Sequence, residues 1–322
     1  MRKRASVLNF SDNIMPQLAN EAELQSLTTE QQNLASQALD TKSALEIATI
    51  INDEDRTIAA AVGRALPQIA EAINAIAEAL GRGGRLIYIG AGTSGRIAAL
   101  DAAECPPTFS TEPNQVRFVI AGGEKALGRA VEANEDSPAL GQRDIAKLKP
   151  GKKDVVVGIA ASGRTPYTIA AVAYGKKKGA KTVGVSCNAD SPLARAADIA
   201  ITADVGPEVI SGSTRMKAGT AQKMILNMLT TGAMTRLGYV YGNFMVNVSP
   251  TNEKLVERAV TILSKAAEID RVHAKEALGK SGSSVPVALV MLKANVNRSE
   301  AKRRLKAAGG HVRRAIESLQ KC

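Results

Sequence analysis

Two short turns of similar composition contain the residues of this sequence that are best suited to bind an anion. The first turn, Gly90 to Arg96, reads G-A-G-T-S-G-R and follows the apolar run Leu86 to Ile89. An alanine-rich helical pattern begins within a few residues of it. Glycines let the backbone approach an anion closely, hydroxyls donate to its oxygens, and the amides of a helix N-terminus point towards it. The pattern therefore predicts a phosphate-binding turn between a buried strand and a helix.

The second turn repeats this arrangement further along the chain. Ala161 to Thr165, A-S-G-R-T, also follows a strand pattern, Asp154 to Ile159, and echoes the T-S-G-R of the first turn. A third cluster rich in hydroxyls, Ser211 to Lys217, adds a cation. Chance explains three such loops poorly. We therefore expect the first two turns to lie at neighbouring strand ends and to hold one ligand from two sides.

A nucleotide is the first alternative ligand, because Gly90 to Gly95 satisfies the dinucleotide pattern G-x-G-x-x-G. That pattern expects an acidic residue about 20 positions further on, at the end of the next strand. Here the next strand, Val116 to Ile120, ends in Ala-Gly-Gly, and neither Glu112 nor Glu124 is suitably placed. The Walker pattern is also absent from this turn. The sequence therefore favours another phosphate compound over a nucleotide.

Composition argues against several classes of partner. The 322 residues carry a net charge of +11, but the basic residues are spread along the chain with a single local excess near the C-terminus. Aromatic residues make up only 3% and tryptophan is absent, which disfavours a base-stacking platform for nucleic acid. A basic protein that binds an anionic metabolite explains the charge equally well. We expect no nucleic-acid and no membrane partner, since no apolar run approaches the ~18 residues of a membrane span.

Cysteine and histidine usage indicates a reducing compartment and no metal site. The three cysteines, Cys105, Cys187 and Cys322, form neither a paired framework nor a C-x-x-C motif, which is typical of a cytoplasmic protein. Cys105 has no histidine near it in sequence, so we interpret it as a packing residue. His273 and His311 lie far apart and lack partner ligands.

Strands alternating with helices predict an α/β protein with a doubly wound parallel sheet and its ligands at the carboxyl ends of the strands. Residues 1–27 are expected to be a poorly ordered extension, 28–247 the α/β domain with its N-terminal helices, and 248–322 a small helical C-terminal domain.

In the N-terminal part we expect a helix from Thr29 to Ile51, a stop at Asn52 to Asp55, and a helix to Leu80 kinked at Pro67. The remaining predicted strands are Thr182 to Ser186 and Ile199 to Ile201. The remaining predicted helices run to about Glu104, then over Glu124 to Asn134, Leu140 to Ala146, Tyr167 to Lys178, Pro192 to Ala196, Thr220 to Leu237, Asn252 to Lys265, Asp270 to Leu278, Val285 to Lys293, Ser299 to Ala308 and Gly310 to Leu319.

At these residues the chain resembles the SIS (sugar isomerase) domain family of phosphosugar-binding proteins and, more closely, the family of N-acetylmuramic acid 6-phosphate etherases. The similarity extends from about Thr29 to the end. The runs E-C-P-P-T and S-G-S-T-R-M-K are its most specific parts. The matching stretches are Gly90 to Arg96, Leu100 to Phe109, Ile120 to Gly123, Ala130 to Asp136, Val157 to Tyr167, Ser211 to Lys223, Thr251 to Leu255 and Glu300 to Leu305.

The resemblance implies a reaction in the recycling of cell-wall amino sugars. The lactyl ether on carbon 3 of the sugar 6-phosphate is lost by elimination, water adds back at carbon 3, and N-acetylglucosamine 6-phosphate and D-lactate result. No metal or redox cofactor is implied. The family's two functional glutamates correspond to Glu104 and Glu135, each of which the helical pattern places at a helix end. We assign Glu104 as proton donor to the departing oxygen and Glu135 as the second acid/base, and leave open which of them removes the proton from carbon 2.

The resemblance also implies a phosphate site and a homodimer. Ser94, Ser162 and Thr165 are expected to bind the phosphate, with Thr93 nearby and the amides of Gly95 and Gly163 helping. Weaker candidates for contacts to the sugar or phosphate are Glu208, Ser211, Ser213 and Lys217. A non-catalytic phosphosugar sensor and a phosphosugar isomerase remain alternatives. The retention of both glutamates favours an enzyme, and the E-C-P-P-T run favours the etherase.

Overall fold

The computed structural model describes residues 27–129, 134–248, 250 and 252–318. Except for Leu27, the expected N-terminal extension lies outside these residues, as do Leu319 and Cys322 at the other end. Among the described residues, no helix is both long enough and apolar enough to cross a membrane.

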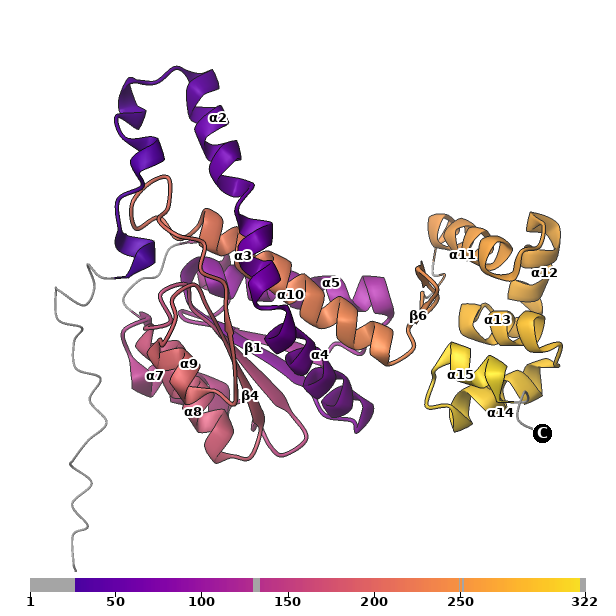
Figure 1. Cartoon of the computed structure of the whole chain (residues 1–322). Coiled ribbons are helices and arrows are strands. Elements are labelled where there is room, and N and C mark those ends of the chain that lie inside the picture. Colours follow the sequence, from indigo (N-terminus) through magenta and orange to yellow (C-terminus); the bar gives the residue numbers. More distant parts are fainter. Residues whose placement is uncertain (1–26, 130–133, 249, 251, 319–322) are drawn as a thin grey trace, which may run out of the picture.

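A five-stranded parallel sheet forms the centre of the described α/β part (Figure 1). Its strands follow the order β2-β1-β3-β4-β5, and the predicted doubly wound parallel sheet is confirmed. Strands β1 and β3 are continuous apolar runs with every residue buried, because helices cover both faces of the sheet. The bounds are β1 Leu86–Gly90, β2 Val116–Ile120, β3 Val155–Ile159, β4 Lys181–Ser186 and β5 Ile199–Thr202.

Helices pack on both faces of the sheet. One face carries α3 (Ile58–Arg64), α4 (Leu66–Gly81), α5 (Gly92–Phe109) and α10 (Lys217–Arg236), whose buried side chains share a core with Tyr88 and Val157 of the sheet. The other face carries α7 (Pro138–Ala146), α8 (Pro166–Lys177) and α9 (Pro192–Ala196), which pack against Ile87, Ile89 and Val156. The order of the strands reverses between β1 and β3, which is the position where open α/β sheets bind their ligands.

The N-terminal part differs from the sequence prediction. The helix expected from Thr29 to Ile51 is replaced by three 3₁₀ turns, η1 (Thr28–Glu30), η2 (Leu34–Ser36) and η3 (Leu39–Thr41), followed by α2 (Ala44–Asp55). Ser43 and Glu46 start α2 with a reciprocal capping box, and the stop expected at Asn52 to Asp55 is wrong because α2 continues through these residues. Pro67 does not kink a long helix. It lies in the first turn of α4, where its missing N–H costs no hydrogen bond.

Two further helices differ in length from the prediction. Helix α5 continues past Glu104 to Phe109, although Pro106 and Pro107 lie within it, and Cys105 and Phe109 remain packed in the core. Glu104 is therefore inside the helix rather than at its end. The helix expected from Glu124 to Asn134 begins as the short α6 (Lys125–Gly128), and residues 130–133 lie outside the described part of the chain.

The C-terminal helices have a hydrophobic core of their own, which extends from Val246 to Ala315. We propose on this ground that they form a separate domain. A small antiparallel ribbon of β6 (Val240–Tyr241) and β7 (Phe244–Met245), absent from the sequence prediction, precedes them. The helices are α11 (Glu253–Ala267), α12 (Arg271–Ser281), α13 (Val285–Ala294), α14 (Arg298–Ala307) and α15 (Val312–Glu317).

Candidate active site

The first turn lies between β1 and the N-terminus of α5, as predicted. Ala91 precedes the helix and has no side chain that could cap its first amides. Ser94 is only 8% exposed, and its hydroxyl donates to Oε1 of Gln222 on α10 at 2.9 Å. The buried Nε2 of Gln222 has no hydrogen-bond partner among the described residues. An uncapped helix N-terminus with an unused donor beside it is suited to an anion.

The second turn lies between β3 and α8, beside the first. Strands β1 and β3 pair in parallel with Gly90 opposite Ile159, so the expectation that the two turns follow neighbouring strands is confirmed. Gly163 has a φ of 67°, which glycine adopts without strain, and a Cβ here would collide with Ser191. The hydroxyl of Ser162 accepts from the Arg164 amide at 3.2 Å. Thr165 begins α8 without a side-chain cap, but the first amides of this helix are used within the chain, since those of Thr168 and Ile169 both donate to the Thr165 carbonyl at 3.1 Å.

Glu135 lies beside the second turn. The Tyr167 amide, in the first turn of α8, donates to the Glu135 backbone carbonyl at 3.0 Å. Glu135 is half-buried and lies in a turn just before α7, which packs closely against α8. The structure therefore brings one of the two predicted acid/base residues to the second turn.

Glu104 lies elsewhere on the molecule. It is ten residues after Ser94 on the same helix, which corresponds to about 15 Å along the axis of α5 at 1.5 Å per residue. Its exposed side chain lines a cavity of about 430 Å³ between α5 and α10. Within one chain, Glu104 is thus well separated from the first turn.

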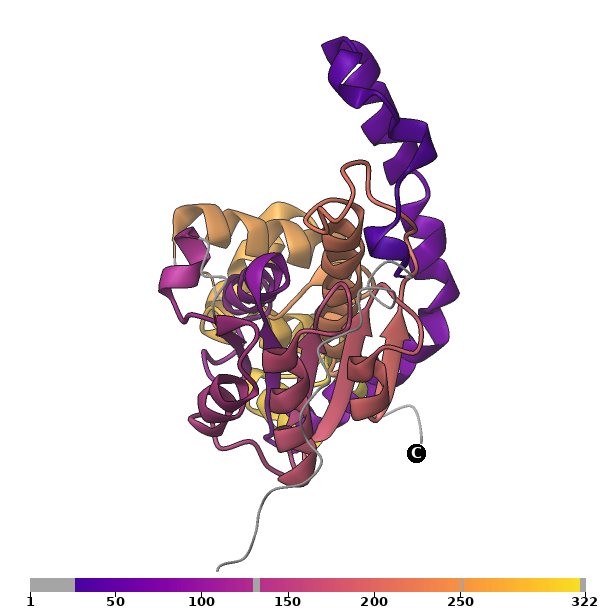
Figure 2. The same ribbon diagram turned by 90° about the vertical axis from the view of Figure 1, so that its left-hand side faces the viewer.

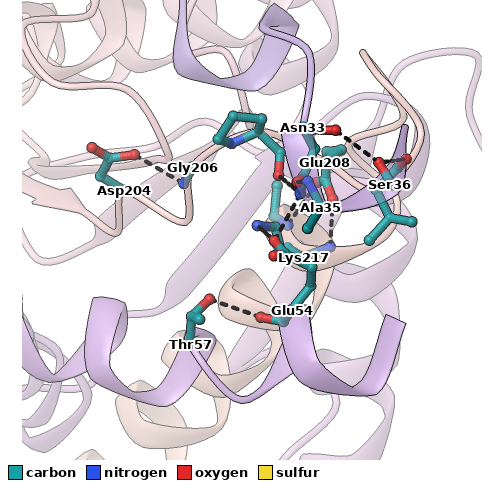
Figure 3. Close-up of polar contacts among 12 residues, drawn as sticks. Asn33, Ala35, Ser36, Glu54, Thr57, Asp204, Gly206, Glu208 and Lys217 are labelled. Carbon is teal, nitrogen blue, oxygen red and sulfur yellow. Dashed lines mark hydrogen bonds and ion pairs between the residues drawn. The ribbon is translucent and has the colours of Figure 1, made fainter. Parts of the chain in front are cut away.

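The third cluster is held by the N-terminal part of the chain (Figure 3). Lys217 is 2% exposed, and its ammonium forms an ion pair with Glu54 at the end of α2, with Nζ and Oε2 2.6 Å apart. The side-chain amide of Asn33 donates to the same Glu54 oxygen at 2.8 Å. These contacts join the loop before α10 to the segment that includes α2.

Glu208, just before this cluster, and Ser211 and Ser213 within it also contact protein groups. Glu208 is fully buried, and its carboxylate accepts from the amides of Lys217 and Ala218, both at 2.9 Å, which caps α10. Burial raises the pKa of Glu208, and these two hydrogen bonds partly oppose the rise. The Ser211 hydroxyl donates to the Glu30 carbonyl at 3.1 Å, and the Ser213 amide donates to the Ile210 carbonyl at 2.9 Å.

Sequence reasoning did not single out three residues that support the site. Gln222 orients Ser94, as described above. Arg96 donates to the carbonyls of Ala126 at 3.0 Å and Arg129 at 2.9 Å, which holds the segment that leads towards Glu135. A guanidinium after a glycine turn is a signal that could have suggested such a role. Gln222 gave no signal, because its partner is 128 residues away.

Asp101 is the third of these residues. It is a buried carboxyl group on α5 that accepts from the hydroxyls of Tyr88 at 2.8 Å and Thr230 at 3.1 Å. Burial raises its pKa to about 6, and the two hydrogen bonds oppose the rise. The neighbouring Cys105 is buried as well, and burial raises the pKa of its thiol to about 12, which agrees with a packing role.

Comparisons with known proteins agree with this fold. The family model of the SIS domain matches residues 138–232, and that of the glucokinase regulatory protein N-terminal SIS domain matches residues 68–176. A protein of Photorhabdus laumondii, named N-acetylmuramic acid 6-phosphate etherase, is 52% identical over 92% of this chain and 99% of its own length. A protein of the same name from Edwardsiella ictaluri is 54% identical over 91% of this chain and 98% of its own. Among solved structures, a phosphoheptose isomerase from Francisella tularensis aligns with a TM-score of 0.49 at 19% identity, over 60% of this chain and all of the other.

Proposed function

The chain belongs to the family of N-acetylmuramic acid 6-phosphate etherases, and from this premise we propose how its residues perform the reaction. It cleaves the lactyl ether of N-acetylmuramic acid 6-phosphate and yields N-acetylglucosamine 6-phosphate and D-lactate. In the open-chain sugar the proton on carbon 2 is acidic because it lies next to the aldehyde. Its removal expels lactate from carbon 3, and water then adds to the unsaturated aldehyde. The observation that carries this function is the identity of about half of all residues over nearly the whole chain.

We propose that the two turns bind the phosphate group. The hydroxyls of Ser162, Thr165 and, once it turns away from Gln222, Ser94 donate to its oxygens, and Thr93 lies next to Ser94 in the first turn of α5. The amides of Gly95 and Gly163, which were expected to help, donate instead to the carbonyls of Ala91 at 3.2 Å and Ala160 at 3.0 Å. The uncapped N-terminus of α5 supports this assignment, since its partial positive charge favours a dianion. Held in this way, the phosphate fixes where carbons 2 and 3 of the sugar lie.

Glu135 acts on the substrate from the same chain as the turns. Its backbone carbonyl accepts from the amide of Tyr167, two residues after Thr165, and this contact supports the proposed role. A carboxylate here can exchange a proton with the sugar while the phosphate remains in place. Lys217, Glu208, Ser211 and Ser213 hold the loop before α10, so in this proposal they support the site rather than contact the substrate.

Glu104 acts from a second copy of the chain. Five bonds of about 1.5 Å separate the phosphorus from carbon 3, whereas Glu104 is about 15 Å along α5 from Ser94. A substrate bound by the turns of one chain is therefore too short to reach Glu104 of that chain. We propose a homodimer in which Glu104 of each chain protonates the departing oxygen of the substrate bound to its partner.

The N-terminal segment supports an assembly of this kind. Helix α2 has no buried residue and projects from the rest of the chain in both views (Figures 1 and 2). Leu34 and Leu45 are 77% and 78% exposed on this projection. Exposed apolar side chains on a projecting helix are suited to packing against another subunit.

We also propose a cytoplasmic location, which the free, buried thiols of Cys105 and Cys187 support.

Mixing inactive variants tests both the reaction and the dimer. Lactate release from N-acetylmuramic acid 6-phosphate is measured for the wild type, Ser94→Ala, Glu104→Gln and Glu135→Gln. Each variant alone is expected to be nearly inactive. If Ser94→Ala and Glu104→Gln are unfolded together and refolded as a 1:1 mixture, half of the dimers are mixed and each has one complete site. About a quarter of the wild-type activity should then return.

The matched control is the mixture of Ser94→Ala with Glu135→Gln. Both residues serve the same site from the same chain, so this mixture should remain inactive. No lactate release by the wild type would refute the etherase function. Recovery in neither mixture, with an active wild type, would refute the shared site.

A further inference from the structure

Helices α5 and α10 lie side by side and run in the same direction. Ser94 contacts Gln222, and about two turns later Asp101 contacts Thr230, so the pairs follow the same order along both helices. The cavity of about 430 Å³ that contains Glu104 lies along this pair. The cavity therefore lies between two helices, of which α5 begins in the first turn and α10 contacts that turn through Gln222.

The lining of this cavity combines an apolar wall with one cation. Ile97, Leu100, Leu226 and Phe109 contribute the apolar part. Of the described residues that line the cavity, Lys223 is the one that carries a positive charge. Its side chain is exposed and makes no ion pair or hydrogen bond with the described part of the chain, although its charge lowers the pKa of Asp101. The carboxyl group of Asp101 accepts from two hydroxyls, and no hydrogen bond or ion pair joins it to the Lys223 ammonium among the described residues.

The leaving group of the reaction has the complementary chemistry. Lactate carries a methyl group and a carboxylate on the carbon next to the ether oxygen. If Glu104 protonates that oxygen, the methyl group and the carboxylate must be accommodated beside Glu104. A carboxylate near a proton-donating glutamate needs a cation, since two like charges in one cavity repel each other.

We propose that Lys223 is a specificity-determining residue that binds the carboxylate of the lactyl group, while the apolar wall receives its methyl group. This inference rests on the proposed function, because it takes Glu104 as the proton donor. Lys223 then selects the lactyl ether over the same sugar phosphate with an uncharged substituent. It also holds the ether oxygen at Glu104 and neutralises the carboxylate as lactate departs.

The experiment compares two ligands that differ only in the carboxylate. The ligands are N-acetylmuramic acid 6-phosphate and 3-O-ethyl-N-acetylglucosamine 6-phosphate, which has the same ether without the carboxylate. Binding is measured by calorimetry to Glu104→Gln and to Glu104→Gln/Lys223→Met, so that turnover does not interfere. The second substitution should weaken binding of the first ligand about 10- to 100-fold, the loss expected for one charge-assisted hydrogen bond, and leave the second within about twofold.

Turnover in the chain that retains Glu104 provides the second measurement. Lys223→Met should lower kcat/KM for N-acetylmuramic acid 6-phosphate to a similar degree, and Lys223→Arg should restore part of it. Lys302→Met, at an exposed lysine on α14, is the matched control and should have no effect. Equal weakening of both ligands, or of neither, would overturn the role of Lys223. Absence of lactate release by the wild type would instead overturn the etherase function itself, so the two failures are distinguishable.

Discussion

Replacing Asp101 with asparagine tests whether a buried carboxyl group between the sheet and two helices makes stability depend on pH. Asp101 is 8% exposed and accepts hydrogen bonds from Tyr88 on β1 and Thr230 on α10. Burial raises its pKa from 3.8 to about 6 in the folded chain, and the two hydroxyls oppose the rise. The folded protein therefore binds this proton more tightly than the unfolded chain does.

The sign and size of the effect follow from these two values. A group whose folded pKa is raised contributes its full stability below the unfolded pKa, near 4, and loses it as the pH rises through 6. The difference of about two pH units corresponds to a total of about 3 kcal/mol. Between pH 5.0 and 7.5 the wild type should lose about 1.4 kcal/mol of unfolding free energy through Asp101 alone. The Asp101→Asn variant would carry no such dependence, because an amide does not titrate in this range.

Urea unfolding of both proteins at pH 5.0, 6.0 and 7.5, at one protein concentration, measures the effect. Other titrating groups cancel in the difference between the two proteins. Asparagine accepts only one of the two hydroxyls well, so Asp101→Asn has a cost that does not vary with pH, but its stability relative to the wild type should improve as the pH rises. Asp40→Asn, at an exposed side chain, controls for the loss of one charge. A difference that is constant with pH, or that changes in the opposite direction, would refute the reasoning.

Two further predictions concern the loops of the site. Lys217→Met should lower the free energy of unfolding by about 2–4 kcal/mol, because it leaves the largely buried carboxylate of Glu54 without its cation. The double variant Lys217→Met/Glu54→Leu should lose less stability than the sum of the two single changes. Strict additivity of the two changes in urea unfolding would contradict the ion pair. Gly163→Ala should cost at least about 1–2 kcal/mol and reduce lactate release, since alanine is strained at a φ of 67° and its Cβ would meet Ser191. Gly151→Ala, where a Cβ meets nothing within 4 Å, should be nearly neutral, and equal melting temperatures for the two variants would contradict this prediction.

The sequence predicts the central sheet well because buried parallel strands have a strong local signal. Each of β1 to β5 is a short apolar run that ends in glycine or a polar turn, and the structure places their ends within a residue or so of the prediction. The N-terminal region has no such signal. Its apolar residues, such as Leu34 and Leu45, are exposed in this chain, so no buried face fixes a long helix here. The expected long helix is therefore wrong there.

Most of the features that the sequence does not predict are side-chain contacts between residues that lie far apart in the chain. The partners Lys217 and Glu54 are 163 positions apart, and Ser94 and Gln222 are 128 apart. No spacing in the sequence relates such residues. The C-terminal limit of α5 also depends on packing. Two prolines would indicate an end near Glu104, but the helix continues to Phe109, and the side chains of Cys105 and Phe109 are packed in the core.

The sequence by itself determined the family of this protein and its candidate residues, because the glycine and hydroxyl turns and the two glutamates all lie in short, local runs of residues. Only the tertiary structure decided how these parts are distributed. Pairing of β1 with β3 brings the two turns together, and the contact with α8 adds Glu135. The straight path of α5 carries Glu104 about 15 Å away, to a cavity shared with Lys223. The physical reason is that residue types are set locally, whereas their separation in space depends on strand order and helix packing, which arise from contacts across the whole chain.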